Sequence, residues 1–80
     1  MTAIVNIFLK EGVLDPQGKA IHHALDAMNF EGIEDVRMGK QIVLKLTSSN
    51  KEEALKEVAK MAEDILANTV IEDYTIELVE

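Results

Sequence analysis

Residues 2–10, TAIVNIFLK, constrain the fold most, because this run carries apolar side chains on both of its possible faces. The run is rich in β-branched and aromatic residues, contains no breaker, and predicts a β-strand. Side chains alternate along a strand, so two faces are expected. One face carries Ala3, Val5, Ile7 and Leu9, and the other carries Ile4, Asn6, Phe8 and Lys10. Both faces of this strand therefore need cover.

The stretch GVLDPQGKA comes next and holds the only proline and two of the four glycines. Gly12 is expected to relieve a turn, Asp15 to cap the free N–H groups of a helix, and Pro16 to fill the first helical position. The spacing does not match a Walker phosphate-binding loop. Helical periodicity predicts a helix over 16–29, which Asn29 can end by adopting the left-handed conformation.

Three further strands and one further helix are predicted after this helix. Their residue ranges are 33–39 and 41–48 for two strands, 50–67 for the helix and 70–80 for the last strand. A tight turn at Gly39 and Lys40 is expected to join the first two of these strands. Ser49 is expected to open the helix through a capping box, and Asn68 to stop it.

The order β-α-β-β-α-β predicts an α+β, ferredoxin-like domain with a four-stranded antiparallel sheet and both helices on one face. The whole chain, 1–80, is expected to form this single domain. Ile4, Phe8 and Val43 would then lie on the face that no helix covers. Burying Ile4 and Phe8 against a second copy would contribute about 1.5–3 kcal/mol each. We therefore expect self-association through these three side chains, as a dimer or a tetramer.

Composition limits the possible functions. The chain has no cysteine, so disulfides and thiolate metal sites are excluded, and a core built from 80 residues is small. The net charge of −7 disfavours binding to nucleic acid and to anionic membranes. No apolar run is long enough to span a bilayer, and the N-terminal residues lack the features of a secretion signal, which favours the cytoplasm.

Few side chains are placed for chemistry. The neighbouring His22 and His23 would point about 100° apart on a helix and could not chelate one metal together. Ser48 and Ser49 are better explained by helix capping, and the acidic pairs by solvated surfaces. We expect no catalytic residue, no metal site and no bound cofactor.

Three stretches, LKEGVLDPQGKA, VRMGK and LANTVIEDY, follow one another in an order and at separations that resemble the PurS family. This family is the small subunit of bacterial and archaeal phosphoribosylformylglycinamidine (FGAM) synthase, and the resemblance covers nearly the whole chain. It implies a non-catalytic, self-associating subunit that assembles with the PurL synthetase and the PurQ glutaminase in de novo purine biosynthesis. PurQ would release ammonia from glutamine, and PurL would use ATP and Mg to convert formylglycinamide ribonucleotide to the amidine, so this chain would bind none of these compounds.

The positions that match the family fall into two groups. Backbone roles explain Gly12, Asp15, Pro16, Gly18, Gly39 and Asn68. Contacts with the partner subunits are expected from Val13, Leu14, Arg37, Lys40 and Glu72. A sensing module of the ACT type, which has the same order of strands and helices, is the alternative, although its D-x-P-G pattern is poorly matched because Pro16 follows Asp15 directly.

Overall fold

The computed structural model describes residues 1–80 and confirms the α+β class. Its elements are β1 (Thr2–Leu9), α1 (Pro16–Ala27), β2 (Gly39–Lys45), α2 (Lys51–Met61), the π-helical η1 (Ala62–Leu66) and β3 (Glu72–Val79). None of the helices combines the length and the apolar character that crossing a membrane requires.

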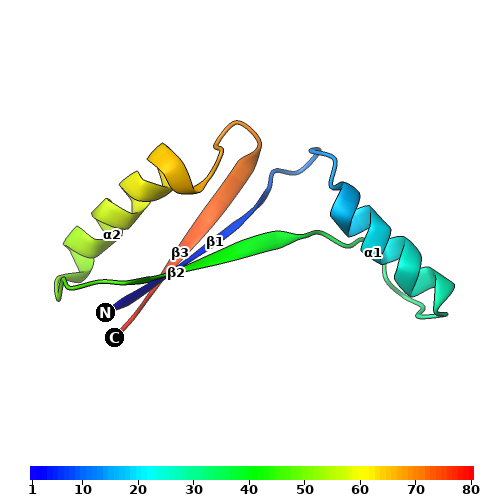
Figure 1. Ribbon diagram of the computed structural model, residues 1–80, viewed down its shortest axis with the longest axis horizontal. Coiled ribbons are helices and arrows are strands. Elements are labelled where there is room, and N and C mark those ends of the chain that lie inside the picture. Colours follow the sequence, from blue (N-terminus) through cyan, green and yellow to red (C-terminus); the bar gives the residue numbers. More distant parts are fainter.

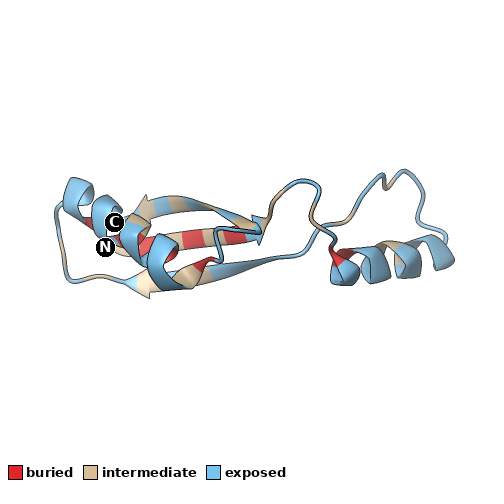
Figure 2. Ribbon diagram, turned by 90° about the horizontal axis from the view of Figure 1, so that it is seen from above, coloured by how far each residue is buried: buried red, intermediate tan, exposed pale blue.

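The strands form one antiparallel sheet in the order β2-β1-β3, with Ala3 opposite both Leu44 and Leu78. The strand with two apolar faces, β1, is therefore the central one. Helix α2 covers one face of the sheet, where Val5 and Ile7 of β1 are buried together with Val58 of α2. Figure 2 shows buried segments, in red, on both β1 and α2. This layer of α2 on the sheet is the core.

The chain is long and thin, because α1 lies beyond the end of the sheet (Figure 1). Its extents are 48 × 27 × 15 Å, and its radius of gyration is 16.0 Å. A compact domain of this length has a radius of gyration of about 12 Å. Only nine of the 80 residues are buried, so much of the apolar surface has no cover within the chain.

The strand predicted over 33–39 is absent, which corrects the expectation of a four-stranded sheet. Residues 30–38 form no regular structure, and the sheet has three strands. Their backbone groups bond elsewhere. The carbonyl of Ile33 lies 2.8 Å from His22 Nε2, the N–H of Val36 bonds to the Asp35 side chain, and the N–H of Met38 bonds to Asp15. Side-chain partners of this kind compete with a strand ladder.

The expectation that both helices cover the sheet is also wrong, since only α2 does so (Figure 1). Helix α1 packs instead against the irregular segment that follows it, and its half-buried side chains are His22 and Leu25. Asn29 has φ +67° and ends α1 in the left-handed conformation, as predicted.

Two local predictions need correction. Gly39 lies in no turn; it opens β2 opposite Phe8, and a Cβ there would lie 2.9 Å from the Ile7 carbonyl oxygen, so glycine permits this close approach. The N-cap of α2 is Asn50, whose side chain accepts a hydrogen bond from the Glu53 N–H, in place of Ser49.

Candidate functional site

The most unusual part of the molecule is the junction between the sheet and α1. Because β1 and β2 are neighbours and Phe8 lies opposite Gly39, residues 10–38 are inserted at one end of a two-stranded hairpin. We call residues 10–38 the arm. Its two ends lie together, and Arg37 Nη2 donates a hydrogen bond of 3.3 Å to the Lys10 carbonyl oxygen.

Asp15 holds this junction. Its Oδ1 accepts a hydrogen bond from the Gly18 N–H at 2.9 Å, which caps α1, and its Oδ2 accepts one from the Met38 N–H at 2.7 Å. The residue is 4% exposed and is the one charged residue among the buried ones. The hydrogen bonds from Met38 and Gly18, with the nearby Arg37 guanidinium, lower the pKa of Asp15 below its ordinary 3.8.

Gly18 lets the two sides of the junction touch. It lies in the first turn of α1 and is buried, and a Cβ built on it would overlap the Val36 carbonyl oxygen. Any larger residue would push the returning chain away from α1. Two neighbouring residues have the roles that the sequence predicts: Pro16 is the first residue of α1, and Gly12 has φ +87° in the turn before it.

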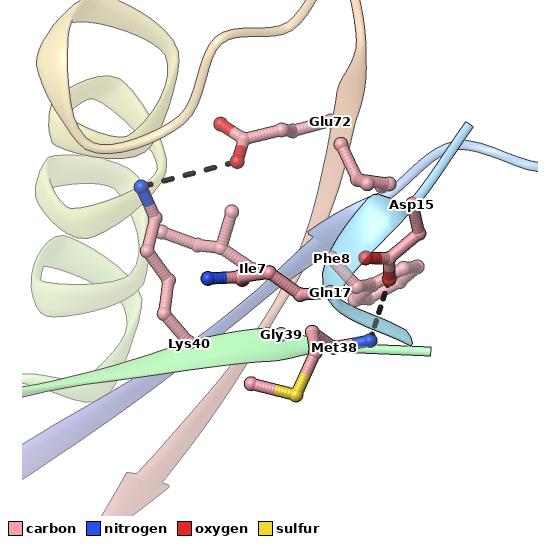
Figure 3. A pocket seen from close by; sticks show the side chains of 9 residues that line it. Ile7, Phe8, Asp15, Gln17, Met38, Gly39, Lys40 and Glu72 are labelled. Atoms are coloured by element: carbon pink, nitrogen blue, oxygen red, sulfur yellow. Dashed lines mark hydrogen bonds and ion pairs between the residues drawn. The ribbon is translucent and has the colours of Figure 1, made fainter. Parts of the chain in front are cut away.

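A shallow hollow of about 230 Å³ lies between the sheet end and the junction (Figure 3). Lys40 and Glu72 reach toward each other across it, with 3.9 Å between Nζ and Oε2. Both lie on the α2 side of the sheet, since they stand opposite Ile7 and Leu9 in the strand register. The other oxygen of Glu72 accepts a hydrogen bond of 2.7 Å from the Asn68 N–H, which fixes the carboxylate.

A second hollow, of about 220 Å³, lies on the arm and brings together Val13, Leu14 and Arg37. Leu14 is 65% exposed. The five predicted partner-contact residues thus form two groups, and Asp15 lines both hollows. The structure therefore places these residues around one junction.

The face of the sheet that α2 leaves uncovered is mixed in character. Phe8 and Val43 are exposed there, and Ile4 is half-buried next to Val43. We call these three residues the bare-face cluster. Between Phe8 and the other two lies Asn6, which hydrogen-bonds with Gln41 and with side chains of β3.

Sequence reasoning missed some exposed apolar residues near the end of α2. Ile65 lies at helical spacing from Val58 and Met61, which favours a place in the apolar stripe of a helix over 50–67, but in η1 it is 82% exposed. Val70 is equally exposed in the following loop. An apolar residue at helical spacing predicts a core position, so the sequence contained no sign of this exposure.

Titratable side chains do not gather into a metal site: no group of three or more His, Asp or Glu residues is placed to hold an ion. His22 Nε2 is engaged with the Ile33 carbonyl, and His23 is exposed.

Comparisons with known proteins agree on one family. The family model described as "PurS: Phosphoribosylformylglycinamidine (FGAM) synthase" matches residues 2–80. The PurS subunit of Bacillus subtilis is 47% identical over 76 residues, which cover 95% of this chain and 89% of that protein. A B. subtilis PurS crystal structure superposes with a TM-score of 0.82, at 46% identity and over 99% and 98% of the two chains. The PurS-like chain in a Thermotoga maritima PurLQS structure has a TM-score of 0.88, 29% identity and coverage of 98% and 95%. This chain therefore belongs to the PurS family and is a PurS subunit of the FGAM synthase of purine biosynthesis.

Proposed function

We propose that this chain is a non-catalytic assembly subunit, which self-associates and joins the PurL and PurQ subunits so that glutamine can serve as the nitrogen source. It binds no cofactor, and ATP, Mg and glutamine are used by the partner subunits. The proposal rests on one observation: this elongated chain leaves apolar surface uncovered. The uncovered surface includes the bare-face cluster and helix α1, which lies away from the core. The T. maritima PurLQS structure, which contains a similar chain, supports the choice of partners.

Self-association through the bare-face cluster would give each copy the second covering layer that β1 lacks. Removing Phe8 and Ile4 from water would contribute about 1.5–3 kcal/mol for each side chain. Small domains commonly need a further support, such as disulfides, a metal or a partner chain, and this chain has no cysteine. The cluster fits a dimer, and the exposed arm offers a second surface through which dimers could pair.

The contacts with PurL and PurQ are proposed around the junction, at Val13, Leu14, Arg37, Lys40 and Glu72. Leu14 presents an apolar side chain to solvent, while Lys40 and Glu72 form an ion pair that a partner could contact. Specific protein interfaces usually combine apolar anchors with polar groups, and the two groups of residues around the junction would supply one of each.

Reconstitution from separate subunits tests the function. Glutamine-driven synthesis of the amidine should be lost when this chain is left out, whereas ammonia-driven synthesis by PurL should persist. Equal loss of both activities would show that the chain also shapes the PurL active site, and would contradict a purely assembling role. Leu14→Asp should reduce only the glutamine-driven rate.

Self-association is tested by Phe8→Asp, which places a charge in the proposed apolar contact and next to Asp73. Sedimentation equilibrium should show loss of the oligomer. Leu55→Asp is the matched control, because Leu55 is 46% exposed on α2, close to the 40% of Phe8, and lies on the other side of the sheet. An oligomer that survives Phe8→Asp would place the interface elsewhere.

A further inference from the structure

Helix α1 stands away from the sheet, yet hydrogen bonds hold its first turn against the start of β2. We propose that Asp15 is a positioning residue whose carboxylate forms a joint between α1 and β2, and so sets the direction in which the arm presents α1 to a second copy of the chain. The inference rests on the proposed self-association only in naming a second copy of the chain as the partner of α1. The joint itself is a property of the single chain.

The joint uses both oxygens of one carboxylate. Oδ1 takes the Gly18 N–H in the first turn of α1, and Oδ2 takes the Met38 N–H, one residue before β2 begins. Asp15 and Met38 are 23 residues apart in sequence. This single side chain therefore connects the outgoing and returning segments of the arm.

Capping alone does not require a carboxylate. Asn, Ser and Asp cap helices about equally well, because each needs only one acceptor oxygen. At Asp15 a second N–H donor, that of Met38, points at the other oxygen. An asparagine would either turn its NH₂ group toward this donor or give up the cap. Making both bonds therefore requires a carboxylate, whereas an ordinary N-cap does not.

Two further contacts fix the same joint. The missing Cβ of Gly18 lets the Val36 carbonyl approach α1, and Arg37 ties the returning chain to the Lys10 carbonyl oxygen. Rotation of α1 about the junction would disturb these contacts together with both bonds of Asp15.

The side chains that α1 presents suit a second copy. Ile21 lies on α1 and is 38% exposed. Met28, the residue after the end of α1, is also exposed. An isolated helix of 12 residues is marginal in water, so cover for these side chains would stabilise it. The charged residues of α1 are Lys19 and Asp26, which cancel, whereas the whole chain carries −7. The helix can therefore approach an acidic second copy with little repulsion.

The distance between two spin labels tests the joint. The chain has no cysteine, so His23→Cys on α1 and Glu57→Cys on α2, both exposed positions, give two unique labelling sites. Labelled chain is mixed with an excess of unlabelled chain, so that each measured distance lies within one chain. The wild-type background should give one narrow distance distribution. Asp15→Asn should lose this narrow peak while circular dichroism shows that the helix content of the chain is unchanged.

Asp35→Asn is the matched control, because Asp35 is an exposed carboxylate of the arm that accepts only from the next residue's N–H. It should keep the narrow peak. If Asp15→Asn does not fold, Asp15→Ser replaces it, since the serine hydroxyl can cap α1 but is too short to reach Met38 as well. A narrow peak in the folded variant, or a broad one in the wild-type background, would overturn the joint.

Sedimentation of the same samples separates this inference from the proposed self-association. A monomeric chain with a narrow distance would remove the self-association and leave the joint. An oligomer with a broad distance would do the reverse.

Discussion

The sheet with α2 and the arm with α1 are held together by different forces. In the first region the buried residues are apolar, such as Val5, Ile7 and Val58, and their removal from water stabilises the layer. In the arm the buried residues are Asp15 and Gly18, which make hydrogen bonds and a close backbone contact. The first region therefore has an apolar core under α2, although its other face is uncovered, whereas the arm is held by polar contacts and has no apolar core.

This difference predicts two kinds of dependence on protein concentration. Burial within one chain does not change with concentration, so the loss of stability caused by a mutation in the core under α2 should be equal in dilute and concentrated protein. Cover supplied by another chain stabilises the folded chain more as the concentration of the partner rises above its dissociation constant. Mutations in the two regions should therefore be distinguishable even when the residue type is the same.

The largest expected effect comes from Ile7→Ala, because Ile7 is fully buried under α2. Loss of its side chain should lower the free energy of unfolding by about 2–5 kcal/mol. The matched change in the arm is Ile21→Ala, which should cost less in dilute protein, since Ile21 is already partly in water. Urea unfolding at a low and a high protein concentration provides the comparison. The Ile7→Ala loss should be equal at both, and the Ile21→Ala loss should grow with concentration. Equal losses for both variants at low concentration would mean that the arm has a core of its own.

A smaller effect is expected from Gly18→Ala, which forces a methyl group against the Val36 carbonyl oxygen. Overpacking of this kind typically destabilises by about 1–3 kcal/mol. Thermal melting measures the loss, and amide chemical shifts should change in residues 34–38 but not in the sheet. Gln17→Ala, at the exposed neighbouring position of the same helical turn, should leave both unchanged. Shift changes that spread through the sheet would contradict the independence of the two regions.

The sheet region was predictable from the sequence because its pattern is local. Alternation along residues 2–10 placed Val5 and Ile7 under a helix and Phe8 on the opposite face, and the structure agrees. The arm was only partly predictable: Asp15 and Pro16 indicate where α1 starts, but the partner of the second Asp15 oxygen, Met38, lies 23 residues away. No local pattern encodes such a contact.

The absence of the strand predicted over 33–39 could not be read from the sequence for the same reason. Residues 33–38 contain strand-forming residues, yet the Ile33 carbonyl and the N–H groups of Val36 and Met38 bond to the side chains of His22, Asp35 and Asp15. Hydrogen bonds to side chains, two of them from distant parts of the chain, have here overridden a local preference that spans only about 1 kcal/mol. The contacts that we propose for residues such as Leu14 are with other chains, which no local pattern in this sequence describes.

Acid should weaken the arm before it weakens the sheet. The pKa of Asp15 is lowered in the folded chain, so its contribution is complete above the ordinary value of 3.8 and is lost as pH falls through the folded value. Amide resonances of Gly18 and Met38 should therefore move in one step below pH 3.8, while those of β1 stay constant. In Asp15→Asn this step should be absent. A step that persists in the variant would assign the acid sensitivity to another carboxylate.

The smallest expected effect on stability lies in the sheet region. There the hydrogen bond between Tyr74 and Glu63 can be compared with the hydrogen bonds of Asp15 in the arm. Tyr74 OH donates a hydrogen bond of 2.8 Å to Glu63 Oε1, and this bond raises the pKa of Tyr74 above 10.0. Its contribution is complete below pH 10.0 and is lost as pH rises through the folded value. Because Tyr74 is the only tyrosine and the chain has no tryptophan, ultraviolet absorbance follows its titration alone. Glu63→Gln should move the titration toward 10.0 and barely change the melting temperature, since the apolar core carries this region. A melting temperature that falls as far as in Gly18→Ala would show that polar contacts support both regions alike.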